Sequence, residues 1–241
     1  MKWLAAIVLL PLFALASWEM DFDEDFAVAS WKPPDVLDGL VGRWTFDDVA
    51  GSTVPDASGN GNTGALDGGA AIEVGGVTGN ALVLIADVPG RVILNNATMT
   101  SVGGGDWTVT WWTKGLKTYG NAPIYSGVLI FGGYGVVMGG YTAFSILLND
   151  TANMKWPVPS PNNWTFCAMT KNGTSYTLSI NGVDITSTSF ADNGWGTGGM
   201  YEIGVGYNYP VYKYLGMLDD VRLYNRALSS NEVATIYNFY K

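Results

Sequence analysis

The stretch LGMLDDVRLYNRAL, residues 215–228, decides the predicted fold. Its apolar and polar residues alternate around Val221 and Leu223, which is typical of a strand whose two faces meet different surroundings. In a regular strand, Asp219 points to the same apolar face as Val221 and Leu223. A carboxylate on an apolar face needs a hydrogen-bonding or cationic partner. We therefore expect a closing strand that holds one unusual, partnered acid.

A short helix is expected directly after this strand. Ser229 and Glu232 have the spacing of a capping box, which predicts a helix that continues to about Tyr237. No other segment has convincing helical periodicity.

Short strands are expected through the rest of the folded region. Asn172-Gly173 and Asn181-Gly182 each separate two alternating runs, which is a strong signal for a β-hairpin. Other runs rich in β-branched and aromatic residues predict strands at 41–47, 63–67, 81–84, 91–94, 106–113, 128–131, 136–138, 144–148, 164–171, 175–181, 183–188 and 201–205. The fold class is therefore all-β, an antiparallel β-sandwich (jelly roll) with a short C-terminal helix.

The amino-acid composition excludes several classes of function. The chain has 241 residues, of which 48% are hydrophobic, and its net charge is −9. An acidic chain does not suit binding to a nucleic-acid backbone, which needs a basic face. The sequence has no histidine, which excludes Ser-His-Asp triads and histidine-bound zinc. Cys167 is the only cysteine, so no intrachain disulfide can form, and we expect a buried, inert thiol.

Two segments precede the predicted domain. Residues 1–16 (MKWLAAIVLLPLFALA) have the pattern of a secretory signal peptide, with a retained apolar arm as the alternative. This run is too short for a comfortable transmembrane helix. Residues 17–38 are acidic and contain Pro33-Pro34, so they predict a linker or an arm along the domain. The jelly-roll domain is expected at 39–241, and the protein is expected to be secreted or surface-displayed.

The acidic run EMDFDE, residues 19–24, suggests an enzyme at first sight. It resembles the E-x-D-x-x-E catalytic run of glycoside hydrolase family sixteen, in which the glutamates act as nucleophile and general acid on a central strand. Here Glu19 and Glu24 precede the first convincing strand, and nothing around them alternates as a sheet would. We interpret the run as part of the linker and keep a glycanase as the least favoured alternative.

Separated stretches of the chain resemble one family. GLVGRWTFD at 39–47 with DASGNGN at 56–62, the hairpin YTLSINGV at 176–183, and GMLDDVRLYNRAL at 216–228 are similar to the laminin G-like branch of the concanavalin A-like lectin/glucanase superfamily. The resemblance implies a jelly-roll fold. It also implies a mostly non-catalytic module that binds glycans or proteins, often with calcium.

The partner of Asp219 follows from pairing the first strand with the last, which protects a sheet edge. That pairing brings the loop 56–62 close to Asp219. Asp219 then accepts hydrogen bonds from backbone amides of this loop, or it shares a structural calcium ion with loop oxygens. The calcium alternative, which the resemblance implies, has the ligand set Asp47, Asp56, Asn62 and Asp219.

Aromatic side chains in predicted loops are the candidates for ligand contact. Exposed aromatic rings stack on sugars and form the centres of protein interfaces. Trp156 stands in a proline-framed loop and Trp195 among glycines, and a tyrosine-rich loop precedes the closing strand. The predicted ligand-binding residues are Trp156, Trp195, Tyr207, Tyr209 and Tyr212.

These features favour a non-catalytic extracellular module that recognises a glycan or a protein partner. The alternative is a structural assembly protein, such as a virion decoration, fibre or surface-sheath subunit, which would use the N-terminal arm to dock onto neighbouring copies. Neither function involves nucleic acid or a stable transmembrane anchor.

Overall fold

The computed structural model shows a unit within Pro33–Lys241 that is built almost entirely of β-strands. It describes residues 35–84, 90–94, 102, 105–115, 162–189, 201–204 and 216–241, together with the backbone of 125–131, 134–139, 143–148 and 152–157. The predicted signal peptide or arm, the linker up to residue 34, and Glu19 and Glu24 therefore lie outside the described residues. No helix of the described part is both long and apolar enough to span a membrane.

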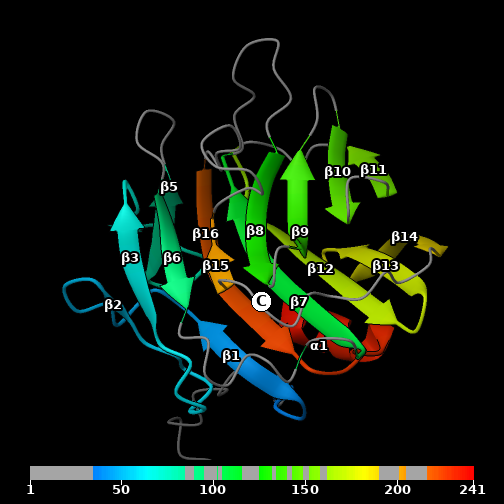
Figure 1. The fold of residues 1–241 in the computed structure, drawn as a ribbon, viewed down its shortest axis with the longest axis horizontal. Coiled ribbons are helices and arrows are strands. Elements are labelled where there is room, and N and C mark those ends of the chain that lie inside the picture. Colours follow the sequence, from blue (N-terminus) through cyan, green and yellow to red (C-terminus); the bar gives the residue numbers. More distant parts are fainter. Residues whose placement is uncertain are drawn as a thin grey trace, which may run out of the picture. The chain divides into compact units, whose positions relative to one another are not determined.

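Eight strands form the first sheet, called sheet A. β1 lies off the main path and pairs with β16 (Figure 1). The order along the main path is β14 (Val183–Ser189), β13 (Ser175–Ile180), β12 (Thr165–Asn172), β7 (Trp107–Lys114), β16 (Gly216–Tyr224), β5 (Asn80–Leu84) and β4 (Ala71–Val74), with β1 at Leu40–Trp44.

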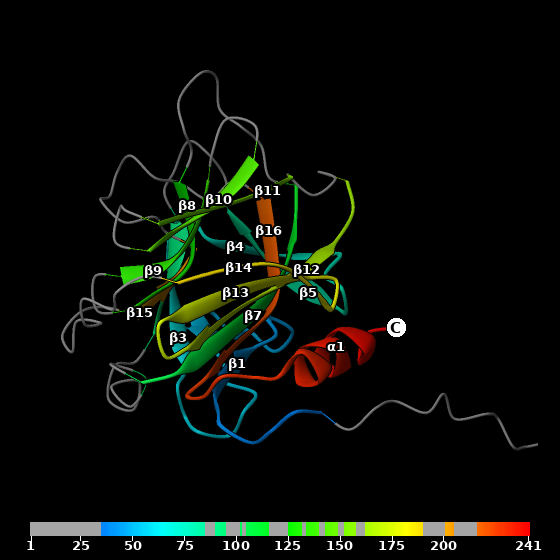
Figure 2. The same cartoon turned by 90° about the vertical axis from the view of Figure 1, so that its right-hand side faces the viewer.

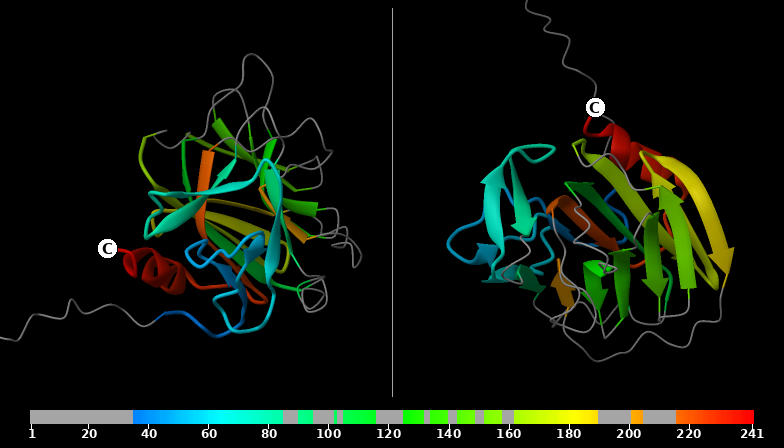
Figure 3. Two further views of the ribbon diagram at one scale, coloured as in Figure 1. Left: turned by 90° about the vertical axis from the view of Figure 1, so that its left-hand side faces the viewer. Right: turned by 90° about the horizontal axis from the view of Figure 1, so that it is seen from above.

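The second sheet, called sheet B, also has eight strands, and every pairing in both sheets is antiparallel. Its order is β11 (Ala152–Pro157), β10 (Ala143–Leu148), β9 (Tyr134–Gly139), β8 (Tyr125–Phe131), β15 (Tyr201–Ile203), β6 (Gly90–Leu94), β3 (Gly64–Gly68) and β2 (Thr53–Val54). The two sheets form separate layers, as Figure 3 shows from above. The predicted antiparallel sandwich is confirmed.

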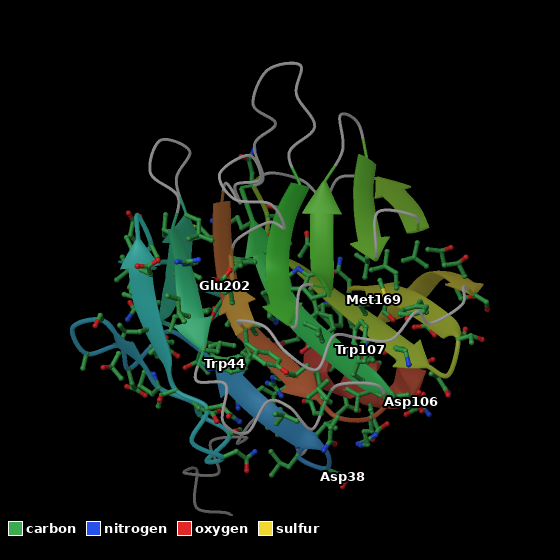
Figure 4. The ribbon with its side chains drawn as sticks, viewed as in Figure 1. Asp38, Trp44, Asp106, Trp107, Met169 and Glu202 are labelled. Carbon is green, nitrogen blue, oxygen red and sulfur yellow. The ribbon has the colours of Figure 1, made fainter. Side chains whose placement is uncertain are left out.

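The main core fills the space between the sheets. Trp44 and Trp107 are fully buried there with Met169 (Figure 4). Sheet B contributes alternate residues, Val92 and Leu94 of β6 among them. The thiol of Cys167 is also buried in this core, and burial raises its pKa, which agrees with the expected inert cysteine.

A second core lies on the outer face of sheet A, under helix α1 (Ser230–Asn238) (Figure 2). Val233 and Ile236 of the helix pack with Trp112 and Phe166 of the sheet. The predicted capping box is confirmed: the Ser229 side chain accepts a hydrogen bond from the Glu232 amide, and the Glu232 carboxylate accepts one from the Ser229 amide. Both faces of sheet A are therefore covered along much of its length.

β16 is the strand on which sheet A is assembled. β7 pairs along one side of it. The other side is shared, because β5 pairs with Gly216–Leu218 and β1 pairs with Val221–Tyr224. The predicted pairing of the first strand with the last is confirmed. Asp219 and Asp220 lie at the junction where one neighbour is replaced by the other.

The structure differs from the predicted strands in two ways. The strand expected at 41–47 ends at Trp44, because Phe46 turns the backbone with a φ of 62°. No strand was predicted at β2, β4 or β11. β2 has only two residues, and three of the four residues of β4 are exposed, so neither shows an apolar alternation. Both predicted hairpins are present, and positive φ angles at Asn181 and Gly182 match the twisted turn that Asn-Gly favours.

Candidate functional site

The closing strand contains a β-bulge that changes the orientation of its acids. The register of β16 against β7 shifts between Asp219 and Arg222, and Asp220 has a φ of 40°. Leu218 and Val221 both pack in the inner core, whereas Asp219 stands opposite Trp112, a residue of the outer face. The prediction that Asp219 shares the face of Val221 is therefore wrong, because the extra residue of the bulge breaks the alternation.

Asp219 is buried under the turn that joins β4 to β5, which we call the glycine turn (residues 75–80). Its Oδ2 accepts hydrogen bonds from the amides of Val77 and Thr78, at N–O distances of 2.7 and 3.4 Å. Its Oδ1 accepts one from the amide of Asp220, at 2.7 Å. The backbone amides that we expected are present, but they come from the glycine turn and not from the loop 56–62.

Burial raises the pKa of the Asp219 carboxyl to about 7, although the amides of Val77, Asp220 and Thr78 oppose the change. The neighbouring Asp220 carboxylate raises the pKa further. No ion pair to Asp219 occurs among the side chains that the structure describes. Near neutral pH, a cation that bound beside Asp219 would therefore favour its ionised form and displace the proton.

Asp47 reaches the same turn from the other side. Its Oδ1 accepts a hydrogen bond from the Asn80 amide at 2.8 Å, and its backbone oxygen accepts one from the Asn80 side chain at 3.2 Å. Phe46, the residue before it, has a left-handed φ that is unusual for a bulky side chain. Residues in such unfavourable conformations persist where the surrounding structure requires them, often at functional sites.

The glycine turn has oxygen donors of the kind that the calcium prediction requires, namely backbone carbonyls and the carboxylate of Asp219. A Cβ atom on Gly76 would lie 2.3 Å from the Asn80 carbonyl oxygen and 2.6 Å from both Asp219 Oδ2 and the Thr78 carbonyl oxygen. These contacts leave no room for a side chain on Gly76, so the turn is closely packed against Asp219. The described residues contain no group of three or more acids, histidines or cysteines, so an ion here would need carbonyl ligands, as calcium accepts and zinc does not.

The other two predicted metal ligands lie in a different turn. Asp56 accepts hydrogen bonds from the amides of Arg43, Ser58 and Asn62, each at 2.9 Å. The Asn62 side chain donates to the Val41 carbonyl. Asp56 and Asn62 therefore hold their own loop against β1, and the structure brings together only Asp47 and Asp219 of the predicted set.

Asp220 and Arg222 form a buried ionic cluster on the outer face of sheet A. Asp220 accepts hydrogen bonds from Nε of Arg43 and of Arg222, both at 2.7 Å. Both arginines also pair with Asp35 and donate to the Tyr240 hydroxyl. Burial alone would raise the pKa of Asp220, but the two arginines outweigh it and lower the value. This cluster ties both ends of the described unit to the bulge and fixes the backbone beside Asp219.

One tryptophan that sequence reasoning did not select lies beside the glycine turn. Trp164 is half-buried, and its indole Nε1 donates a hydrogen bond to the Gly75 carbonyl at 3.1 Å. The Lys114 ammonium lies 6.0 Å from the centre of its ring. The sequence contains one signal that could have identified it. Trp164 is the first residue of the predicted strand 164–171, and residues at strand ends are often partly exposed.

Of the five predicted aromatic residues, the structure places the backbone of only one. Trp195, Tyr207, Tyr209 and Tyr212 lie outside the described residues. Trp156 lies on β11 opposite Phe144, and not in the loop that we expected.

The fold is similar to that of several solved domains. Domain 4 of an extracellular arabinanase from Geobacillus stearothermophilus, solved with arabinotriose, is 20% identical, with a TM-score of 0.61 over 82% of this chain and 97% of that one. The binding domain of Paraclostridial Mosquitocidal Protein 1 is 18% identical (TM-score 0.61; 83% of this chain, 52% of that one). A structure of botulinum neurotoxin type C, whose cell entry depends on two ganglioside molecules, is 13% identical (TM-score 0.63; 86% of this chain, 52% of that one).

This chain thus spans about half the length of the two toxin chains and nearly all of the arabinanase domain. Among curated proteins, none matches the chain. A family model described as "Concanavalin A-like lectin/glucanases superfamily" matches residues 90–234, more than half of the sequence. The chain belongs to the concanavalin A-like lectin/glucanases superfamily.

Proposed function

We propose that the protein is a non-catalytic, extracellular binding module that recognises a glycan, with a protein partner as the alternative ligand. One observation carries the proposal: two acids from distant strands, Asp47 and Asp219, hold one glycine turn against sheet A, with the half-exposed ring of Trp164 beside it. Strained backbone and a poised carboxyl are features of binding sites and are costly in a scaffold that only has to fold. Among the similar structures, the arabinanase domain was solved with arabinotriose and the type C neurotoxin enters cells through gangliosides, which supports a saccharide as ligand.

An array of immobilised glycans, probed with the full-length chain in calcium-containing buffer, tests this proposal. We expect saturable binding to a restricted set of glycans, because aromatic rings and fixed polar groups select sugar shape. Binding to no glycan, together with capture of a defined protein partner, would favour the protein alternative. Hydrolysis of β-glucans that is abolished in Glu24→Gln would favour the glycanase.

We also propose that the glycine turn holds a structural calcium ion, with Asp47 and Asp219 as its acidic ligands. The carboxylates of Asp47 and Asp219, which both hold this turn, and the carbonyls of the turn are oxygen donors of the kind that calcium binds, and this supports the proposal. The ion would be the cationic partner of Asp219, which has none among the described side chains, and it would make the turn rigid. The role of the N-terminal arm in assembly stays a prediction, because residues 1–34 lie outside the described part.

A further inference from the structure

A row of side chains crosses sheet A next to the glycine turn. Register places Ala71 of β4 opposite Val83 of β5, Val83 opposite Met217 of β16, and Met217 opposite Lys114 of β7. Lys114 in turn contacts the ring of Trp164, which leads into β12. We call these five residues the outer row. None of them is fully buried, although they stand on five adjacent segments of the sheet.

The outer row lies on the outer face of sheet A, beyond the edge of the helix-covered core. Residues directly opposite in an antiparallel pair share a face. Leu82 and Leu84 of β5 pack inward, so Val83 between them points outward. Lys114 follows Trp112, an outer-face residue, by two positions, and Trp164 packs against the same outer core. Four strand spacings of about 4.8 Å make the row about 19 Å long, which is enough for several linked sugar rings.

Trp164 is held in a fixed orientation on this row. Its indole N–H is used by the Gly75 carbonyl, so the edge of the ring is anchored to the turn and the ring cannot rotate freely. A fixed, partly exposed aromatic face is the group on which the C–H face of a pyranose stacks. Apolar neighbours in the row, Met217 and Val83, extend this surface along the sheet.

Lys114 is the cationic residue of the outer row. All four arginines of the chain pair with carboxylates, and Lys171 donates to the Gly105 carbonyl. The Lys114 ammonium has a ring as its contact and no carboxylate among the described side chains, although the net charge of the protein is −9. An ammonium beside a stacking ring is complementary to a sugar that carries a carboxylate.

We propose that the outer row binds an acidic oligosaccharide, with a pyranose ring stacked on Trp164 and its carboxylate paired with the Lys114 ammonium. The proposal rests on the glycan-binding function above and names its substrate class and its site. Asp219 holds the glycine turn, and the Gly75 carbonyl of that turn orients Trp164. The turn would therefore affect binding by positioning Trp164, without touching the ligand itself.

The test compares acidic with neutral oligosaccharides on the full-length chain. Tetragalacturonate and sialyllactose serve as acidic probes, and α-1,4-galactotetraose and lactose as their neutral counterparts, in calorimetric titrations beside the glycan array. We expect the acidic members to bind more tightly than their counterparts. Lys114→Met, which keeps the apolar stem, should weaken binding of the acidic probes by about 10- to 100-fold, the range of a charge-assisted hydrogen bond. It should leave neutral binding unchanged.

Two further variants separate the site from general damage. Lys241→Met removes an equal charge from another lysine–aromatic contact, 4.3 Å from the Tyr237 ring, and should leave affinity unchanged. Trp164→Phe keeps a ring but loses the anchor to Gly75, so it should weaken binding while the melting temperature shows whether the fold is intact.

Glycan binding that is indifferent to both Lys114→Met and Trp164→Phe would overturn this inference and leave the proposed function standing. Preference for the neutral probes would overturn it as well. Binding to no glycan of any kind would remove both together.

Discussion

At the scale of single residues, Asp219 is the most informative position in the chain. Its side chain is 1% exposed, yet it has three amide donors and no basic partner among the described residues. Asp220, the next residue, is equally buried but sits between two arginines. The pKa values of two adjacent acids in one bulge are therefore shifted in opposite directions: that of Asp219 is raised and that of Asp220 is lowered.

The raised pKa of Asp219 predicts an unusual dependence of stability on pH. In the unfolded chain an aspartate ionises near pH 4, whereas in the native state Asp219 keeps its proton up to about pH 7. The native state binds more protons in that window, so the free energy of unfolding should fall as the pH rises from 4 to 7. From pH 5 to pH 8 the loss should be roughly 2–3 kcal/mol, measured by urea unfolding in EDTA.

Asp219→Asn should remove this pH dependence. It should also lower stability at pH 5 by roughly 1–3 kcal/mol, because an amide cannot accept from the donors on both oxygens. Asp56→Asn is the control, since it disturbs three amide bonds in another turn and leaves the Asp219 carboxyl in place. A wild-type protein whose stability is flat or rises across this window would contradict the prediction.

At the scale of elements, the glycine turn depends on side chains being absent. Gly79 has a φ of 56°, and a Cβ atom there would lie 2.2 Å from Asp47 Oδ1. Gly51 has nearly the same backbone conformation, with a φ of 60°, but nothing lies within 4 Å of its Cβ position. The two glycines separate the cost of the backbone conformation from the cost of the contact with Asp47.

Gly51→Ala should therefore destabilise the protein by about 1–2 kcal/mol, the cost of a left-handed residue with a side chain. Gly79→Ala should cost clearly more, roughly 3–4 kcal/mol, because Asp47 must also move away from the Asn80 amide. Urea unfolding of the two variants under the same conditions measures the difference. Equal losses would mean that Asp47 does not hold the turn as described.

Helices, strands and turns were predictable from the sequence where contacts between residues close in sequence determine them. The Asn-Gly hairpins and the Ser229–Glu232 capping box are set by contacts within a few residues, and both are present. β2 was missed because it has only two residues, and β4 because three of its four residues are exposed, so neither strand carries a periodic pattern in its sequence. The side of the sheet that Asp219 faces was missed because a single extra residue reverses it.

At the scale of the whole molecule, three distant parts of the chain meet at the middle of β16. β5 ends its pairing there, β1 begins, and Asp35 and Tyr240 reach the arginines beside it. A ligand that stabilises this junction should therefore stabilise the entire β unit, and not only one loop.

The calcium proposal follows this expectation. Calcium at one hundred times its dissociation constant would add about 2.7 kcal/mol to the free energy of unfolding, which raises the melting temperature of a domain of this size by roughly 5–10 °C. EDTA should lower the melting temperature, and added calcium should restore it. Magnesium is the control ion, since it demands stricter geometry. Asp47→Asn and Asp219→Asn should abolish the response, and a wild-type melt indifferent to EDTA would sink the proposal.

The sequence by itself determined the sandwich class, the hairpins and the closing strand with its capped helix, because these follow from local turn chemistry and apolar periodicity. The pairing of the first strand with the last was expected for another reason, the protection of a sheet edge. Only the tertiary structure decided which turn covers Asp219, that Asp56 and Asn62 hold another loop, and that Trp164 and Lys114 stand side by side. Those contacts join residues up to 142 positions apart in sequence, across a bulge that no periodic pattern reveals. The position of one extra residue in β16 thus determines where the protein places its candidate binding site.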